Sequence, residues 1–163
     1  MKATVRRRLG LAPLHPAVLV ATWFGAGFLP VTPGTWGSLV ALPFAWIIQG
    51  RWGAPGLLLA AALVFAAGCW ASSVVVRSSG VKDPGSIVVD EVAAQWLVLA
   101  TAPRELWLYA AGFFLFRVAD ILKPWPASWA DRRVPGALGV MLDDVVAAVY
   151  AGGILALLGE LAA

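Results

Sequence analysis

The sequence is poor in charged residues: Asp, Glu, Lys and Arg make up 13% of its 163 residues, against about 25% in soluble globular proteins. Hydrophobic residues account for 61%, and the mean hydropathy is +0.83. This composition excludes a disordered chain and most water-soluble enzymes. The net charge of +3 comes from basic residues that are too few and too scattered to form a nucleic-acid-binding face. We therefore interpret the chain as a membrane protein without a nucleic-acid partner.

Cysteine and histidine are scarce as well. Cys69 is the single cysteine, so no disulfide can form within the chain. Position 75 is Val, so Cys69 lacks the arginine that a thiolate phosphatase loop carries six residues later. His15 is the single histidine, and no Asp-x-Asp-x-Thr motif occurs. A covalent phosphoryl intermediate therefore has no suitable nucleophile, which favours attack by metal-activated water.

Long uncharged runs indicate membrane helices. Residues 9–50, 52–76 and 145–159 contain no charge, and two shorter uncharged runs cover 92–103 and 106–116. A helix needs about 20 residues to cross the hydrocarbon core of a bilayer. Proline and glycine divide the runs at turns over 50–55 and 101–104. We expect helices over residues 16–29, 38–49, 55–76, 86–102, 105–123 and 143–159, with a polar loop over 131–139.

The predicted fold class is all-α: a compact membrane-embedded helical bundle with about 4–5 spanning helices. The helix over 16–29 is expected to be short and either interfacial or re-entrant. Residues 1–163 form one predicted domain, and residues 1–15 form its basic cytoplasmic or interfacial N-terminus. The sequence does not indicate an oligomeric state.

The distribution of basic residues predicts the orientation. With the N-terminus in the cytoplasm, ten Lys and Arg residues fall on the cytoplasmic side, and Arg51 and Arg104 alone fall on the far side. This is the asymmetry that the positive-inside rule describes. Seven of the nine acidic residues fall on the cytoplasmic side too. Ionisable groups below the membrane surface are candidates for function.

Five of these acids form three groups: Asp90 with Glu91, Asp120, and Asp143 with Asp144. Mg²⁺ prefers oxygen ligands and is commonly held by a few carboxylates, water and a substrate phosphate. Few basic residues lie near the first and third groups in sequence, which disfavours a purely structural ion-pair network. The pattern favours a site for one or two Mg²⁺ ions.

Arg117, Asp120 and Lys123 share a helical face because they are spaced i, i+3 and i+6. They could form ion pairs within the helix. Beside a metal site, Asp120 could instead bind the ion while Arg117 and Lys123 bind phosphate oxygens.

Two short segments have the composition of helix starts. Residues 33–38 contain glycines that permit close backbone approach, and Ser38 is expected to cap the following helix. Ser86 is expected to cap the helix that carries Asp90 and Glu91.

Four motifs in this order resemble the phosphatidylglycerophosphatase A family. They are PGTWGS at 33–38, GSIVVDE at 85–91, FRVADILKPWP at 116–126 and GVMLDD at 139–144, and the resemblance covers about residues 24–155. It implies an all-helical, Mg²⁺-dependent enzyme of the bacterial inner membrane. Such an enzyme hydrolyses phosphatidylglycerophosphate to phosphatidylglycerol and inorganic phosphate, with its active site facing the cytoplasm.

The resemblance and the residue patterns together define a predicted site. The expected catalytic residues and metal ligands are Asp90, Glu91, Asp120, Asp143 and Asp144. The residues expected to bind the substrate phosphate are Arg117, Lys123, Thr35 and Ser38.

Two other functions fit a small membrane bundle with acidic clusters. A CDP-alcohol phosphotransferase also uses Mg²⁺ in the membrane, but its Asp-Gly-x-x-Ala-Arg pattern is absent. A small ion or metabolite carrier would line a path through the midplane of the membrane with acids. The acids here gather toward one face, which argues against a carrier.

Overall fold

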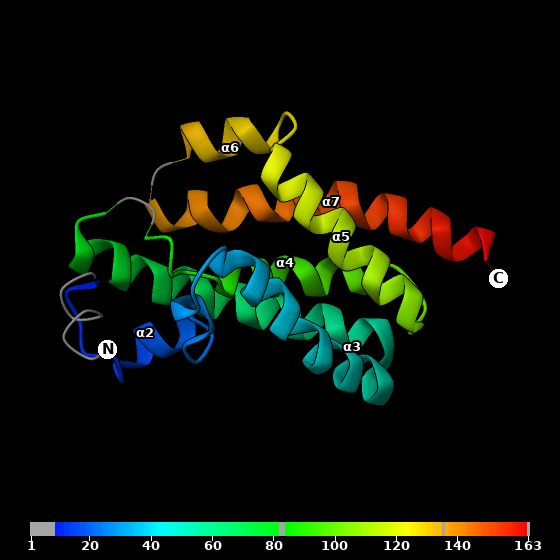
Figure 1. Ribbon diagram of the computed structural model, residues 1–163, viewed down its shortest axis with the longest axis horizontal. Helices are drawn as coiled ribbons and strands as arrows, with labels where there is room; N and C mark the ends of the chain where they lie inside the picture. The colour runs from blue at the N-terminus through cyan, green and yellow to red at the C-terminus, as the bar shows by residue number, and fades with distance from the viewer. Residues whose placement is uncertain (1–8, 82–83, 135, 163) are drawn as a thin grey trace.

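The computed structural model describes residues 9–81, 84–134 and 136–162, and residues 1–8 of the expected basic N-terminus lie outside this part. Every regular element in the described part is a helix and none is a strand, which confirms the all-α prediction. Figure 1 shows α2 (Pro16–Ala21), the 3₁₀ helix η1 (Ala26–Phe28), α3 (Pro33–Ser79), α4 (Val89–Leu99), α5 (Leu106–Leu122), α6 (Ala127–Arg133) and α7 (Gly136–Leu161).

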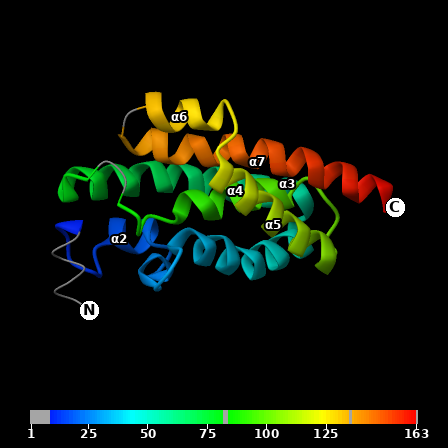
Figure 2. The same cartoon turned by 45° about the horizontal axis from the view of Figure 1, so that its top comes forward.

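The element α3 is a helical hairpin. Gly53 interrupts it with φ 65° and ψ −168°, a conformation that essentially only glycine adopts. Figures 1 and 2 show the chain running out along the first arm and back along the second. The predicted turn at 50–55 is therefore confirmed. The first arm begins at Pro33 instead of residue 38, because proline suits the first position of a helix.

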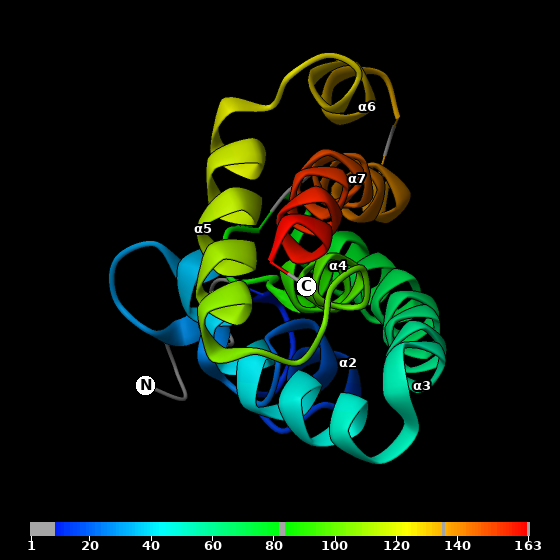
Figure 3. The ribbon, with the colours of Figure 1, turned by 90° about the vertical axis from the view of Figure 1, so that its right-hand side faces the viewer.

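The short helix α4 is the centre of the bundle. Nine of its eleven residues are buried, and it packs against both α3 and α7 (Figure 3). The indole nitrogen of Trp96 donates a hydrogen bond to the carbonyl of Ala41 at 2.9 Å. The predicted cap at Ser86 is wrong, because Val88 is the N-cap residue. The amide of Val88 donates to the carbonyl of Ala21 in α2 at 2.9 Å, which keeps the preceding segment outside the helix.

Helices α5 and α7 also contribute to the core. Helix α5 follows the predicted 105–123 closely: it ends at Leu122, and Lys123 is its C-cap residue, just before Pro124. The predicted polar loop over 131–139 is wrong, since α6 and α7 occupy most of it. Helix α7 begins at Gly136 because the apolar residues after it pack into the core: Met141 is fully buried and close to Gly68 of α3.

Two of the described helices, α3 and α7, are long and apolar enough to cross a membrane. Only 28% of the most apolar stretch of α3 and 44% of that of α7 are buried in the protein. Large hydrophobic side chains are instead exposed on the outer faces of the long helices. Helices α4 and α5 have 11 and 17 residues, so this criterion does not confirm four to five spanning helices.

Candidate active site

All five predicted acids line one cavity of about 290 Å³. Helix α4 contributes its first turn, α5 its last turn, and α7 its second and third turns. The residues that line the cavity are therefore up to 59 positions apart in sequence. The lining residues are Gly85, Ile87, Asp90, Glu91, Asp120, Ile121, Lys123, Val140, Asp143 and Asp144.

Three of these acids form the tightest group. Asp90, Glu91 and Asp144 each offer one carboxylate oxygen, and these oxygens lie within 4.8 Å of one another. Asp90 is 7% exposed and Asp144 is 4% exposed. Oε2 of Glu91 and Oδ2 of Asp144 are buried and have no hydrogen-bond partner in the described part of the chain. Buried oxygens of this kind fit a hard divalent cation, which would satisfy them and offset their mutual repulsion.

The local backbone orients the first acid of each adjacent pair. Asp90 and Glu91 lie in the first turn of α4, where the helix dipole favours negative charge. Oδ1 of Asp90 accepts a hydrogen bond from the amide of Glu91 at 3.0 Å. Asp143 repeats this arrangement in α7, accepting from the amide of Asp144 at 3.1 Å. In each pair the first carboxylate is fixed by the backbone.

Arg117 connects three helices. Its Nη1 atom lies 3.0 Å from Oδ2 of Asp120 in α5 and 4.0 Å from Oε1 of Glu91 in α4. The same nitrogen donates to Oγ of Ser38 in α3 at 3.4 Å. The ion pair within the helix that the spacing allowed is therefore present. Arg117 also brings Ser38 to the carboxylates, as the predicted site requires.

The first turn of α3 closes one side of the site. Ser38 lies inside the helix and donates to the carbonyl of Gly34 at 3.1 Å, so its predicted capping role is wrong. A methyl group on Gly34 would lie 2.0 Å from Oε1 of Glu91 and 3.3 Å from Nη1 of Arg117. Thr35 is half-buried on the same turn and is not among the residues that line the cavity.

Lys123 reaches the cavity from the end of α5. It adopts left-handed backbone angles of φ 44° and ψ 59°, and its ammonium forms an ion pair with Oδ2 of Asp143. Two basic side chains, Arg117 and Lys123, therefore accompany the five acids. If every group is ionised, the site has a formal excess of three negative charges, which favours cation binding.

Comparison with known proteins places the chain in a family. The family model for phosphatidylglycerophosphatase A matches residues 19–159. The chain belongs to the phosphatidylglycerophosphatase A family. It is therefore an enzyme of the phosphatase class. No solved structure matches the chain.

Three relatives show how far the similarity extends. Phosphatidylglycerophosphatase A of Escherichia coli (strain K12) is 40% identical over 161 residues, covering 98% of this chain and 91% of the relative. The enzyme of the same name from Haemophilus influenzae is 41% identical, covering 85% of each chain. A protein of Bacteroides thetaiotaomicron that is provisionally named a phosphatidylinositol-3-phosphatase is 37% identical, covering 85% of this chain and 90% of the relative.

Two features of this phosphatidylglycerophosphatase A family member escaped the sequence analysis. Ile121 lines the carboxylate cavity, and an apolar residue within an apolar helix carries no sequence signal for such a position. Gln95 is fully buried one helical turn after Glu91, and neither polar atom of its side chain has a hydrogen-bond partner in the described chain. The signal for Gln95 was its place as a polar residue within the uncharged run over 92–103.

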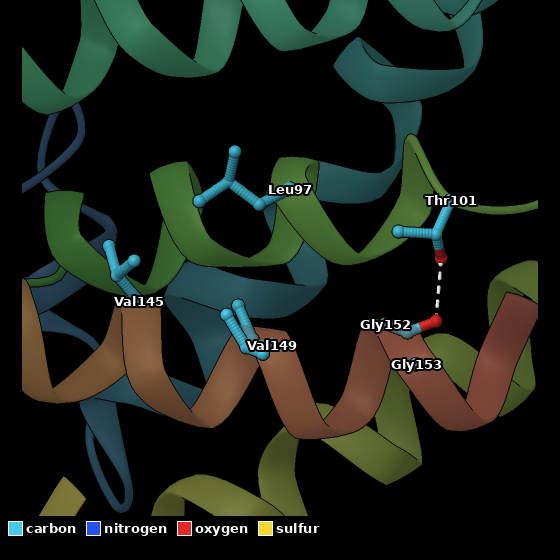
Figure 4. A pocket seen from close by; sticks show the side chains of 7 residues that line it. Leu97, Thr101, Val145, Val149, Gly152 and Gly153 are labelled. Atoms are coloured by element: carbon cyan, nitrogen blue, oxygen red, sulfur yellow. Dashed lines mark hydrogen bonds between the residues drawn. The ribbon is translucent and has the colours of Figure 1, made fainter. Parts of the chain in front are cut away.

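A second cavity of about 290 Å³ lies between α4 and α7 and contains no titratable group. Figure 4 shows the lining residues Leu97 and Thr101 on one side and Val145 and Val149 on α7. Oγ1 of Thr101 donates to the carbonyl of Gly152 at 2.9 Å, which ties the end of α4 to α7. Its apolar lining provides no group for phosphate chemistry, so the carboxylate cavity is the candidate active site.

Proposed function

We propose that this protein is a Mg²⁺-dependent lipid phosphatase that hydrolyses phosphatidylglycerophosphate to phosphatidylglycerol and inorganic phosphate. The observation that carries the proposal is the meeting of five carboxylates, from three helices, with Lys123 in one cavity. Family membership supports the reaction class, and the names of two relatives support the substrate.

Asp90, Glu91 and Asp144 are the proposed ligands of the first ion, because their oxygens already converge. Asp120 and Asp143 line the same cavity and would complete a site for one or two ions. When bound, Mg²⁺ supplies Lewis-acid polarisation of a phosphoryl oxygen and activation of water.

The basic residues have a proposed role toward the substrate. Lys123 lines the cavity and would exchange its contact with Asp143 for a phosphate oxygen. Arg117 holds Asp120 and Glu91 in place and would add positive charge as the phosphate enters. Ser38 would present its hydroxyl beside Arg117. Thr35 remains a proposed neutral donor on the first turn of α3.

The proposed location is the bacterial cytoplasmic membrane, which the chain crosses several times. Two long apolar helices and the exposed hydrophobic surface support a membrane environment. The charge asymmetry of the sequence supports a cytoplasmic N-terminus and active site.

Release of inorganic phosphate by the detergent-purified protein tests the proposal. The substrates are phosphatidylglycerophosphate, phosphatidic acid and phosphatidylinositol 3-phosphate, each with Mg²⁺ and with a chelator. We expect Mg²⁺-dependent release from phosphatidylglycerophosphate and none with the chelator. If phosphate were released faster from phosphatidylinositol 3-phosphate than from phosphatidylglycerophosphate, the preferred substrate would be the one in the name of the third relative.

If the folded protein released no phosphate from any of the three lipids, the proposal would be contradicted. Activity that requires a cytidine nucleotide would favour a CDP-alcohol phosphotransferase. Flux of ions across liposomes containing the protein, without hydrolysis, would favour a carrier.

A further inference from the structure

One exposed hydrophobic side chain forms part of the carboxylate cavity. Ile121 lines the cavity and is 70% exposed. Among the described residues with large, exposed hydrophobic side chains, it alone lines that cavity. Of the other two large hydrophobic residues in the lining, Ile87 is buried and Val140 is half-buried. Ile121 therefore marks an apolar part of the rim of an otherwise strongly charged cavity.

The exposed surface continues from Ile121 along α5. Phe114, Val118 and Ile121 are spaced i, i+4 and i+7, which places them on one face of the helix. Phe114 is 66% exposed and Val118 is 54% exposed. With a rise of 1.5 Å per residue, this apolar stripe extends about 10 Å from the cavity rim. We name the three residues the α5 stripe.

The α5 stripe lies on the outside of the bundle. Phe116, which is on α5 but not on the face of the stripe, is fully buried in a core cluster with residues of α4 and α7. Figure 3 shows α5 along one edge of the molecule, and Figure 1 shows it leading away from the α6 end. The stripe thus begins at the cavity and leads away from its acids.

The chemistry of a lipid phosphate matches this arrangement. If the cavity binds the phosphate end, as the proposed function requires, the acyl chains must leave past the cavity rim. Contact between acyl carbons and the carboxylates or Lys123 would cost free energy, because those charged groups would lose polar partners, whereas apolar side chains can contact acyl carbons without that cost. Ile121 is the apolar residue at the rim from which an exposed apolar surface continues. We propose that the α5 stripe is the seat of an acyl chain of the lipid substrate.

The proposal rests on the proposed function and is tested by the dependence of kcat/KM on acyl length. The substrates are dibutanoyl and dioctanoyl phosphatidylglycerophosphate, in the same detergent with Mg²⁺. The test variant is Phe114→Asn with Val118→Asn. The control is Leu59→Asn with Leu63→Asn, a pair on the second arm of α3 with the same spacing, each 63% exposed and neither lining the cavity.

We expect the wild type to prefer the dioctanoyl lipid. In the stripe variant, the ratio of the two kcat/KM values should fall about tenfold, because apolar contacts with the longer chain are lost. The control variant should keep the wild-type ratio. If the Asn pair does not fold, Phe114→Ala with Val118→Ala should lower the ratio in the same direction.

Three results would overturn the acyl-chain seat while leaving the proposed function intact. In the first, the stripe variant loses kcat/KM equally on both lipids. In the second, the ratio of the two kcat/KM values falls as much in the control variant as in the stripe variant. In the third, the wild type shows no chain-length preference. If the folded wild type hydrolyses neither lipid, the proposed function fails first and the seat fails with it.

Discussion

Gly34 in the first turn of α3 lies directly against Glu91 in the first turn of α4. A methyl group on Gly34 would be 2.0 Å from Oε1 of Glu91, far inside van der Waals contact. The two residues are 57 positions apart in sequence. Their contact shows why the PGTWGS segment belongs to the site: it permits the backbone of α3 to approach the carboxylates.

Gly34→Ala should therefore reduce phosphate release by tenfold or more, because the Glu91 carboxylate must move away from the other carboxylates to make room. A misplacement of about 1 Å in a catalytic site can lower its activity greatly. The fold should survive, since alanine is a better helix former than glycine. The control is Gly153→Ala, where an added methyl group meets nothing within 4 Å. Wild-type activity in Gly34→Ala would contradict the close approach.

Asp144→Asn should lower phosphate release by about 100-fold or more, because it removes a buried charge from the group of three converging carboxylates. Without Mg²⁺ the variant should be at least as stable as the wild type, since like-charge repulsion is relieved. Mg²⁺ at 100 times its Kd should stabilise the wild type by about 2.7 kcal/mol and the variant much less. Thermal unfolding with and without Mg²⁺ measures both effects, with Glu160→Gln as the exposed control. Equal Mg²⁺ stabilisation of both proteins would rule out Asp144 as a ligand.

Lys123 combines an unfavourable backbone conformation with a functional side chain. Its φ of 44° costs a residue with a side chain about 1–2 kcal/mol relative to glycine. Lys123→Gly should therefore be more stable than Lys123→Ala by about 1 kcal/mol. Both variants should lose activity equally, because both lose the ammonium group beside Asp143. Unfolding curves and phosphate release measure the two effects, and unequal activities would mean that backbone geometry also matters.

The hairpin turn of α3 depends on a conformation specific to glycine. Gly53 has φ 65° and ψ −168°, whereas Gly80 has φ 70° and ψ 6°, an ordinary left-handed conformation that asparagine tolerates. Gly53→Asn should lower stability by about 1–3 kcal/mol. Gly80→Asn, which has open space around it, should cost less than about 1 kcal/mol. Comparison of the two melting temperatures checks the turn, and equal shifts would contradict it.

Much of the fold could be predicted because strong local signals mark it. The turn at Gly53 and the bounds of α5 follow from glycine, proline and the limits of uncharged runs. The start of α7 could not be predicted, because the polar residues over 131–139 have the composition of a loop. Burial of Met141 against Gly68 extends the helix, and that contact joins residues 73 positions apart. The caps expected at Ser38 and Ser86 failed for a similar reason, since Pro33 and the bond from Val88 to Ala21 set the helix starts.

Part of the candidate site could likewise be predicted from the sequence, and part could not. The identity of the five acids and of the two basic residues follows from the sequence alone, because charges are rare in an apolar chain and stand out. The sequence also determines the family and the all-helical class. Only the tertiary structure decides that Asp144 joins Asp90 and Glu91, that Arg117 bridges three helices, and that Ile121 reaches the cavity rim. These relationships depend on how helices pack, and packing is set by contacts between side chains far apart along the chain.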